Sequence, residues 1–279
     1  MGNICWIASY PKSGNTWLRM LLANYRADSE TPADINSLGN YGAPARIVFD
    51  EWAGIRASAL DDITVDNILP DVYRSVAREE NGTVFFKAHD MFRFTSRGEP
   101  LFPPDVSTGA VYLVRNVSDV AISFAHHAGI GELEAVQRLC DSHYAVACSG
   151  AGLDAQLRQV LGSWSEHVSS WLDQSAIPLY LVRYEDLLRS PVEVFGGIAE
   201  FCGLPFDEER VRRAVASSRF DELQRQERTN GFSERLERST TPFFRRGRTG
   251  DGAESLPAEL VQRLLDKHRD ILRRLKYLR

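Results

Sequence analysis

Four short apolar runs constrain the fold of this chain more than any other feature. Each run is unbroken and consists largely of β-branched or aromatic residues, as is typical of parallel strands that are covered on both faces. They span residues 4–9, 84–87, 110–114 and 178–182. Stretches with the three- and four-residue apolar spacing of helices cover residues 16–25, 117–128, 132–147, 160–172, 192–201 and 260–275. The alternation predicts an α/β fold, with a parallel sheet and flanking helices in three layers.

Length and charge set further limits. With 279 residues, 43% of them hydrophobic, the chain suits one large α/β domain or two small ones, and the alternation of strands and helices leads us to expect a single domain over residues 1–279. The net charge of −5 gives no attraction to nucleic acid, so any anion site has to be local. Three irregular segments, about 27–66, 94–109 and 226–249, are candidates for the acceptor pocket and cap, because long irregular segments in compact domains are usually functional.

The cysteines and the N-terminus indicate a cytoplasmic protein. The first apolar run has no basic leader before it and breaks at Pro11, so we expect neither a signal peptide nor a membrane span. No CxxC pair and no histidine cluster with zinc spacing is present, and we interpret the cysteines as reduced. They are Cys5, Cys140, Cys148 and Cys202.

The first apolar run continues into a polar loop and a helical pattern, in the sequence ICWIASYPKSGNTW. A helix in this position directs its first backbone N–H groups and the positive end of its dipole at the loop, which makes an anion site. Lys12 adds a positive charge, and Gly14 permits a backbone turn that other residues resist. Further side-chain donors come from Ser13, Asn15 and Thr16. The alternative is an ordinary helix start with Asn15 or Thr16 as the N-cap.

The lysines exclude an ATP or GTP P-loop. That motif requires a lysine directly after glycine, whereas the four lysines here follow proline, phenylalanine, aspartate and leucine. Neither of the two later strands ends in a lone aspartate of the kind that binds magnesium. We therefore expect the loop to bind an anion without a metal site. The lysines are Lys12, Lys87, Lys267 and Lys276.

The stretch YPKSGNTW resembles the 5′-phosphosulfate loop of the cytosolic-type sulfotransferases, which use 3′-phosphoadenosine 5′-phosphosulfate (PAPS). Asn15 replaces the first of two threonines in the usual form, and Trp17 matches its final tryptophan. Three further stretches match in the expected order, so the resemblance extends from Ile4 to about Asp251. It implies that residues 12–17 bind the cofactor.

Two of these stretches imply a site for the 3′-phosphate. YLVRNVSDVAISFAHH resembles the family motif in which an arginine ends a strand and a serine follows eight residues later, here Arg115 and Ser123. An arginine at this end of a parallel strand faces the crevice where α/β folds bind ligands. FFRRGRTGD resembles the late Arg-Lys-Gly-x-x-Gly motif, although Gly252 stands where a tryptophan usually follows. Taken alone, Arg115 could be a surface bridge and the late stretch a solvated charge run. The late motif falls on Arg245, Arg246 and Gly247.

The fourth stretch, FFKAHD, resembles the family's Lys-Thr-His segment, with Ala88 in place of threonine. The resemblance implies that His89 is the general base, since histidine with its ordinary pKa of about 6.5 accepts a proton near neutral pH. It further implies that Lys12 holds the bridging oxygen and that Lys87 steadies the sulfonate oxygens. Ser123 would restrain the catalytic lysine until the acceptor binds.

Four residues match positions around the adenine in this family. Trp17, Tyr184 and Phe220 each offer a flat aromatic face, and Ser218 matches a nearby polar position. Packing in the core is the alternative for the aromatic residues, especially for Phe220.

The resemblance implies transfer of a sulfuryl group from PAPS to a hydroxyl or amine by in-line displacement, which leaves 3′-phosphoadenosine 5′-phosphate (PAP). A nonenzymatic nucleotide-binding protein and a nucleotide-dependent kinase are the alternatives. The presence of His89 and Lys12 argues against a nonenzymatic protein. The absence of a lysine directly after a glycine argues against a kinase.

Six aromatic side chains predict an acceptor pocket with apolar walls. Such a pocket suits a small aromatic, lipid-like or antibiotic-type acceptor. The chain is similar to bacterial members of the family, including those of secondary metabolism. The resemblance to the family also implies a homodimer. The short C-terminal dimer motif that some members carry has no clear match in this chain. The predicted pocket residues are Tyr41, Phe49, Trp52, Phe92, Phe94 and Phe102.

Overall fold

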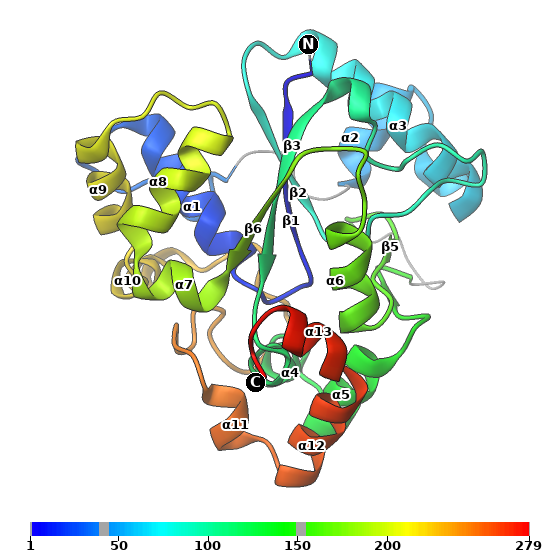
Figure 1. Ribbon diagram of the computed structural model, residues 1–279. Helices are drawn as coiled ribbons and strands as arrows, with labels where there is room; N and C mark the ends of the chain where they lie inside the picture. Colours follow the sequence, from blue (N-terminus) through cyan, green and yellow to red (C-terminus); the bar gives the residue numbers. More distant parts are fainter. Residues whose placement is uncertain (1, 39–44, 149–154, 279) are drawn as a thin grey trace. The chain divides into compact units, whose positions relative to one another are not determined.

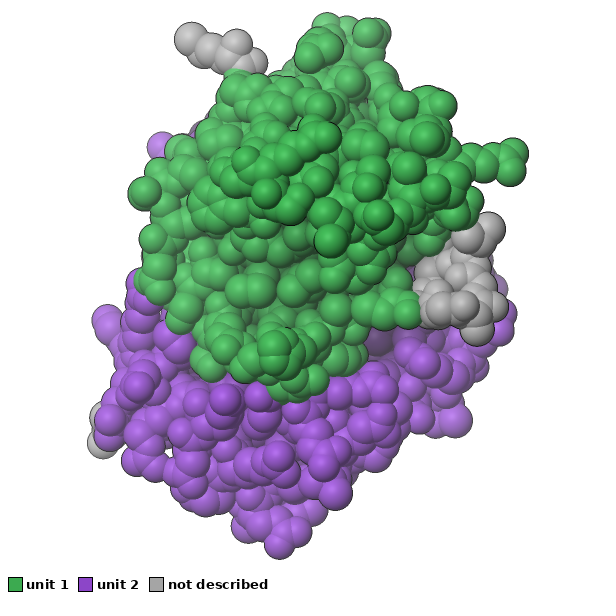
Figure 2. Space-filling model, turned by 90° about the vertical axis from the view of Figure 1, so that its right-hand side faces the viewer, with its two compact units in different colours: residues 1–10, 39–112, 141–181 green, residues 11–38, 113–140, 182–279 purple. Residues whose placement is uncertain are grey.

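The computed structural model describes residues 2–38, 45–148 and 155–278. The chain forms two compact units, coloured separately in Figure 2. Unit 1 comprises residues 1–10, 39–112 and 141–181, and unit 2 comprises residues 11–38, 113–140 and 182–279. Each unit is therefore built from segments that lie far apart in the sequence.

A four-stranded parallel sheet confirms the predicted fold class, a parallel sheet flanked by helices (Figure 1). Its order is β2 (Val84–Ala88), β1 (Ile4–Ser9), β3 (Ser107–Val114) and β6 (Leu179–Arg183). β1 pairs with β2 in parallel, with Ile4 opposite Val84 and Ala8 opposite Ala88. All six residues of β1 are buried, as expected for a central strand with both faces covered. All four predicted strands are present.

Unit 1 packs its helices on the sheet through aromatic side chains. It contains α2 (Arg46–Ala53), α3 (Asp62–Glu79), α6 (Trp164–Leu172) and a small antiparallel pair, β4 (Ala145–Val146) and β5 (Gln159–Val160). The Trp6 ring of β1 meets the rings of Tyr73 on α3 and Phe102 edge-on, each with a centroid distance of 4.9 Å. These edge-to-face contacts stabilise the core beyond the burial of apolar area.

Unit 2 consists mainly of helices (Figure 1). α1 packs against α9, α8 packs against α9, and α4 contacts both α5 and α11. In chain order the helices are α1 (Asn15–Ala27), α4 (Val117–Ala128), α5 (Glu132–Cys140), α7 (Tyr184–Arg189), α8 (Pro191–Phe201), α9 (Glu208–Ser217), α10 (Phe220–Asn230), α11 (Asp251–Ser255), α12 (Ala258–Lys267) and α13 (Arg269–Arg274).

Three predicted helices are shorter than expected. The helix expected over residues 132–147 ends at Cys140, because residues 145–146 pair with β5 as strand β4. The helix expected over residues 160–172 begins at Trp164, where Ser163 and Glu166 form a capping box. The helix expected over residues 260–275 is divided into α12 and α13 at His268, which is buried.

The segments expected to be irregular are only partly so. Residues 27–66 include α2 and the start of α3, whose N-cap Asp61 accepts a hydrogen bond from the backbone N–H of Thr64. Residues 94–109 include a short 3-10 helix (Pro104–Val106) and the first residues of β3. Residues 226–230 complete α10, and residues 231–249 form neither helix nor strand.

None of the four cysteines, all of which lie in the described part of the chain, is paired in a disulfide, and Cys5 and Cys202 are buried. In the described part of the chain, no helix combines the length and the apolar character needed to cross a bilayer. Across residues 2–38, 45–148 and 155–278, no group of three or more His, Cys, Asp or Glu side chains could hold a metal ion.

Candidate active site

The loop between β1 and α1 has an unusual backbone. Lys12 and Gly14 have positive φ values of 72° and 106°. This conformation is easy for glycine, but it costs a residue such as lysine on the order of 1–3 kcal/mol. A Cβ at Gly14 would lie 2.7 Å from the ring of Tyr184, so only glycine fits there. Turns of this kind can direct backbone N–H groups into a concavity that binds anions.

The side chains of this loop match an anion site. Ser13 is buried, and its Oγ has no hydrogen-bond partner among the described residues. An unpaired buried hydroxyl is costly, and a phosphate or sulfonate oxygen would pair with it. Gly14 is the N-cap of α1 and no side chain caps the helix, so the alternative with Asn15 or Thr16 as N-cap is wrong. Thr16 instead donates its hydroxyl to Glu234 at 3.2 Å, and Asn15 is buried.

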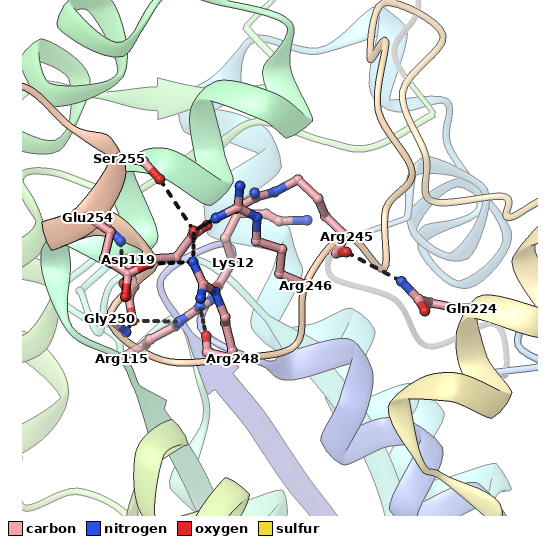
Figure 3. A network of polar contacts seen from close by, with 12 residues as sticks. Lys12, Arg115, Asp119, Gln224, Arg245, Arg246, Arg248, Gly250, Glu254 and Ser255 are labelled. Atoms are coloured by element: carbon pink, nitrogen blue, oxygen red, sulfur yellow. Dashed lines mark hydrogen bonds and ion pairs between the residues drawn. The ribbon is translucent and has the colours of Figure 1, made fainter.

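Lys12 is in contact with two other segments of unit 2. Its Nζ lies 3.6 Å from the ring centroid of Phe243, which is a cation–π contact. Its carbonyl oxygen accepts a hydrogen bond from Nη1 of Arg115 at 3.4 Å. Nη2 of Arg115 donates to the carbonyl oxygen of Arg248 at 2.9 Å. Arg115 therefore connects the loop to residues 245–251 (Figure 3).

Residues 245–251 gather positive charge around one buried carboxylate (Figure 3). Arg245 and Arg246 each pair with Asp251, whose side chain is 1% exposed. Arg248 lies 3.2 Å from Asp251 and 2.5 Å from the exposed Glu254. Burial would raise the pKa of Asp251, but the arginine hydrogen bonds and charges lower it to about 2. The cluster suits a phosphate dianion, because guanidinium groups bind phosphate with paired N–H donors.

Asp119, which the sequence analysis missed, docks this segment on α4. Its carboxylate accepts hydrogen bonds from the backbone N–H groups of Gly250 at 2.9 Å and Gly252 at 2.7 Å. A Cβ at Gly252 would lie 2.1 Å from the carbonyl carbon of Ser118. No side chain fits at position 252, which is the physical reason for glycine where the family pattern has tryptophan. Ser123, one turn further along α4, is half-buried.

The predicted adenine residues form two contacting groups. Nε1 of Trp17 donates to the carbonyl oxygen of Ser218 at 3.0 Å, and the rings of Trp17 and Tyr184 meet edge-on at 5.8 Å. Gly247 has a φ of 58°, and a Cβ there would lie 2.3 Å from the Phe220 ring. Phe220 is therefore close to the arginine segment, which fits a position beside a nucleotide.

Lys87 and His89 lie at the end of β2 in unit 1. Lys87 pairs with Ile7 of β1 and is buried. Nδ1 of His89 lies 2.8 Å from the carbonyl oxygen of Ser9. A carbonyl oxygen only accepts, so Nδ1 carries the proton and Nε2 of the neutral ring keeps its lone pair. This contact fixes the orientation of the His89 ring.

The predicted acceptor residues do not share one environment. Phe92 and Phe102 are buried and pack on Trp171, with centroid distances of 5.5 and 4.8 Å. Phe49 is buried, Trp52 is half-buried and Phe94 is 60% exposed. Tyr41 lies outside the described residues. Phe92 and Phe102 are therefore core residues.

Comparison with known proteins identifies the family. The model of the sulfotransferase domain matches residues 4–274, which is nearly the whole chain. The chain belongs to the sulfotransferase family. The recognition of a PAPS-dependent, cytosolic-type sulfotransferase and the assignment as an enzyme of this class are thereby confirmed.

Individual relatives of this sulfotransferase are distant. Rat sulfotransferase 1C2 is 23% identical over 252 residues, which cover 88% of this chain and 75% of that protein. Cytosolic sulfotransferase 16 of Arabidopsis thaliana is 24% identical over 285 residues, with coverage of 92% and 72%. Among solved structures, retinol dehydratase with androsterone and PAP has a TM-score of 0.63 at 19% identity, with coverage of 97% and 80%. Mouse SULT7A1 with PAP has a TM-score of 0.60 at 18% identity, with coverage of 99% and 89%.

Asp251 gives a first prediction for this sulfotransferase. In Asp251→Asn the three arginines lose their buried counter-charge and repel one another, so we expect a lower melting temperature for the unliganded protein. Bound PAP would bring a phosphate to the same guanidinium groups. The increase in melting temperature with PAP should therefore be larger in the variant than in the wild type. Thermal unfolding with and without PAP measures both effects.

Glu254→Gln is the matched control, because Glu254 is exposed and its side chain pairs with Arg248 and not with the buried Asp251. Asp251 has a pKa lowered to about 2, so its contribution to stability is present above about pH 4 and lost as the pH falls toward 2. The difference between wild type and Asp251→Asn should accordingly stay constant from pH 5 to 8. A smaller PAP response in Asp251→Asn would contradict the interpretation.

Proposed function

We propose that this enzyme transfers a sulfuryl group from PAPS to a hydroxyl or amine of a small-molecule acceptor, with PAP as the product. The observation that carries the proposal is the arrangement of positively charged side chains beside the Lys12 loop in unit 2. There Arg115 contacts both the Lys12 carbonyl oxygen and residues 245–251. A donor with a 5′-phosphosulfate and a 3′-phosphate needs two such clusters of positive charge and N–H groups.

The donor would be held by three groups of residues in unit 2. Lys12, Ser13, Gly14, Asn15 and Thr16 would surround the 5′-phosphosulfate, whose oxygens would accept from the Ser13 hydroxyl, which has no partner among the described residues. Thr16 would contribute its backbone N–H, because its hydroxyl already donates to Glu234. Arg115, Ser123, Arg245, Arg246 and Gly247 would bind the 3′-phosphate. Trp17, Tyr184, Ser218 and Phe220 would surround the adenine.

The chemistry would use His89, Lys12 and Lys87. PAPS supplies an activated sulfuryl group, and the protein's task is positioning and charge stabilisation, as in phosphoryl transfer. Nε2 of His89 would take the proton of the acceptor. The ammonium of Lys12 would meet the charge that grows on the bridging oxygen, and Lys87 would steady the sulfonate oxygens.

The remaining assignments follow from the family and from the chain. We propose that residues 1–279 act as one sulfotransferase domain, with segments 27–66, 94–109 and 226–249 around the acceptor. Retinol dehydratase has been solved in complex with androsterone and with retinol, which supports an apolar small molecule as acceptor here. A role in secondary metabolism, a cytoplasmic location and a homodimer complete the proposal.

Thermal unfolding with nucleotides tests the donor site. A ligand at about 100 times its Kd adds about 2.7 kcal/mol of stability. We expect a large increase in melting temperature with PAP, and a much smaller one with AMP or with ATP and magnesium. Arg115→Gln should lose the PAP response, whereas Arg189→Gln, which changes an exposed arginine, should keep it. Equal responses to PAP and ATP would contradict the 3′-phosphate site.

A further inference from the structure

We propose that His167 is a positioning residue for the general base, because its side chain holds the backbone of His89 in place. The proposal rests on the proposed role of His89. His167 lies on α6 in unit 1, and its Nε2 is 3.0 Å from the carbonyl oxygen of His89. Its Nδ1 is 2.8 Å from the hydroxyl of Tyr112 on β3. No sequence pattern indicates a role for His167.

The directions of these hydrogen bonds follow from the chemistry of the atoms. The carbonyl oxygen of His89 only accepts, so Nε2 of His167 carries the proton, and Nδ1 accepts the hydroxyl proton of Tyr112. His167 is fully buried, and burial lowers its pKa to about 4. It therefore stays neutral at working pH and cannot itself exchange protons with an acceptor. A buried, neutral and fully bonded imidazole is suited to hold its neighbour.

A second side chain of α6 holds the next carbonyl group. Nε1 of Trp171 donates to the carbonyl oxygen of Asp90 at 3.0 Å. His167 and Trp171 are four residues apart and therefore lie on one face of the helix. The carboxylate of Asp90 accepts from the backbone N–H of Val160 at 2.9 Å and from Nε of Arg93 at 3.0 Å. The backbone of residues 89–90 is thus held through two consecutive carbonyl groups.

His89 is consequently fixed at both ends. Its carbonyl oxygen is bound by His167 and its ring Nδ1 by the carbonyl oxygen of Ser9. If the backbone of His89 moves, the ring loses its hydrogen bond to the carbonyl oxygen of Ser9. The proton is then no longer held on Nδ1. A general base acts only within hydrogen-bond reach of its proton, and a misplacement of 1 Å can cost about 10²-fold in rate. Loss of the N–H group that His167 donates to the His89 carbonyl oxygen should therefore reduce turnover.

Two variants separate the hydrogen-bond donor of His167 from the volume of its side chain. His167→Phe keeps a buried ring but removes the N–H, whereas His167→Gln can present its amide N–H near the position of Nε2. Val168→Ala is the control for packing, because Val168 is a buried neighbour on α6. PAP formation from PAPS is measured with 2-naphthol as the probe acceptor, and with water where naphthol is not sulfated. We expect kcat to fall about 10- to 100-fold in His167→Phe, with the Kd for PAP changed less than twofold.

Imidazole ¹⁵N NMR gives a readout that does not depend on activity. The wild type and His167→Gln should show neutral His89 as one tautomer with the proton on Nδ1, and His167→Phe should show a mixture of tautomers. Assignment of the six histidines uses His89→Ala. A single tautomer and an unchanged kcat in His167→Phe would overturn the proposal. A tautomer mixture together with a fully active His89→Ala would instead refute the base and leave the positioning contact standing.

Discussion

Replacing His89 with alanine is expected to lower turnover by about 10²- to 10⁴-fold, which is the usual contribution of a general base. Nδ1 of His89 donates to Ser9, so Nε2 is the nitrogen that can accept the acceptor's proton. The proposed contacts to PAP, which lacks the sulfonate, all come from unit 2, and His89 belongs to unit 1. The Kd for PAP should therefore stay within about twofold. Steady-state kinetics with PAPS and calorimetric titration with PAP measure the two quantities.

The asparagine variant tests the chemical role of the ring more sharply. In His89→Asn the side-chain amide can still donate to the carbonyl oxygen of Ser9, but nothing replaces the lone pair of Nε2. We expect the same loss of turnover as in His89→Ala, with a smaller loss of thermal stability. His143→Ala changes an exposed histidine of the same unit and should retain wild-type kinetics. Wild-type turnover in His89→Asn would remove the base assignment.

Lys12→Met is expected to lower kcat by about 10²- to 10³-fold, as does the removal of a preorganised donor that meets developing charge. Methionine retains much of the length of the side chain but has no charge. Binding of PAP should change less than kcat, because Lys12 is proposed to act on the bridging oxygen of the donor. Lys267→Met, on the exposed surface of α12, is the control for loss of one positive charge.

The backbone of Lys12 makes a second variant informative. Its φ of 72° is costly for lysine but easy for glycine. Lys12→Gly should therefore be less destabilised than Lys12→Met, or even more stable than wild type, and should lose turnover to the same extent. A Lys12→Gly enzyme that is stable but slow would indicate that the strained backbone at position 12 serves to place the ammonium group. A Lys12→Gly enzyme with wild-type kcat would show that the charge is not needed.

The local parts of the site were predictable because they depend on residues that are close in sequence. The strand of residues 4–9, the glycine turn and the helix after it follow from one apolar run, Gly14 and the helical spacing. The prediction of residues 117–128 as a helix agrees with α4 at both ends, where Asn116 is the N-cap and Gly129 the left-handed C-cap. Such signals are local, so a single sequence contains them.

The prediction failed where distant segments decide the structure. The apolar spacing of residues 132–147 favours one long helix, but residues 145–146 pair with Gln159–Val160. Residues 62–79 form α3 although Pro70 lies inside it; the aromatic contact of Tyr73 with Trp6 connects that helix to the sheet. Asp119 is an ordinary acidic residue of a first helical turn in the sequence, and only the fold brings Gly250 and Gly252 to it.

The sequence by itself determined the family, the strand–loop–helix that begins the anion site and the arginines available to it, because these depend on residue types at short spacing. The tertiary structure decided how those groups are arranged. It pairs Arg245, Arg246 and Arg248 with the buried Asp251, and it allows only glycine at position 252, because the backbone of Ser118 lies against it. It also brings His167 to the carbonyl of His89, 78 residues away in the chain. Contacts over such separations depend on packing of the whole unit, which local patterns do not specify.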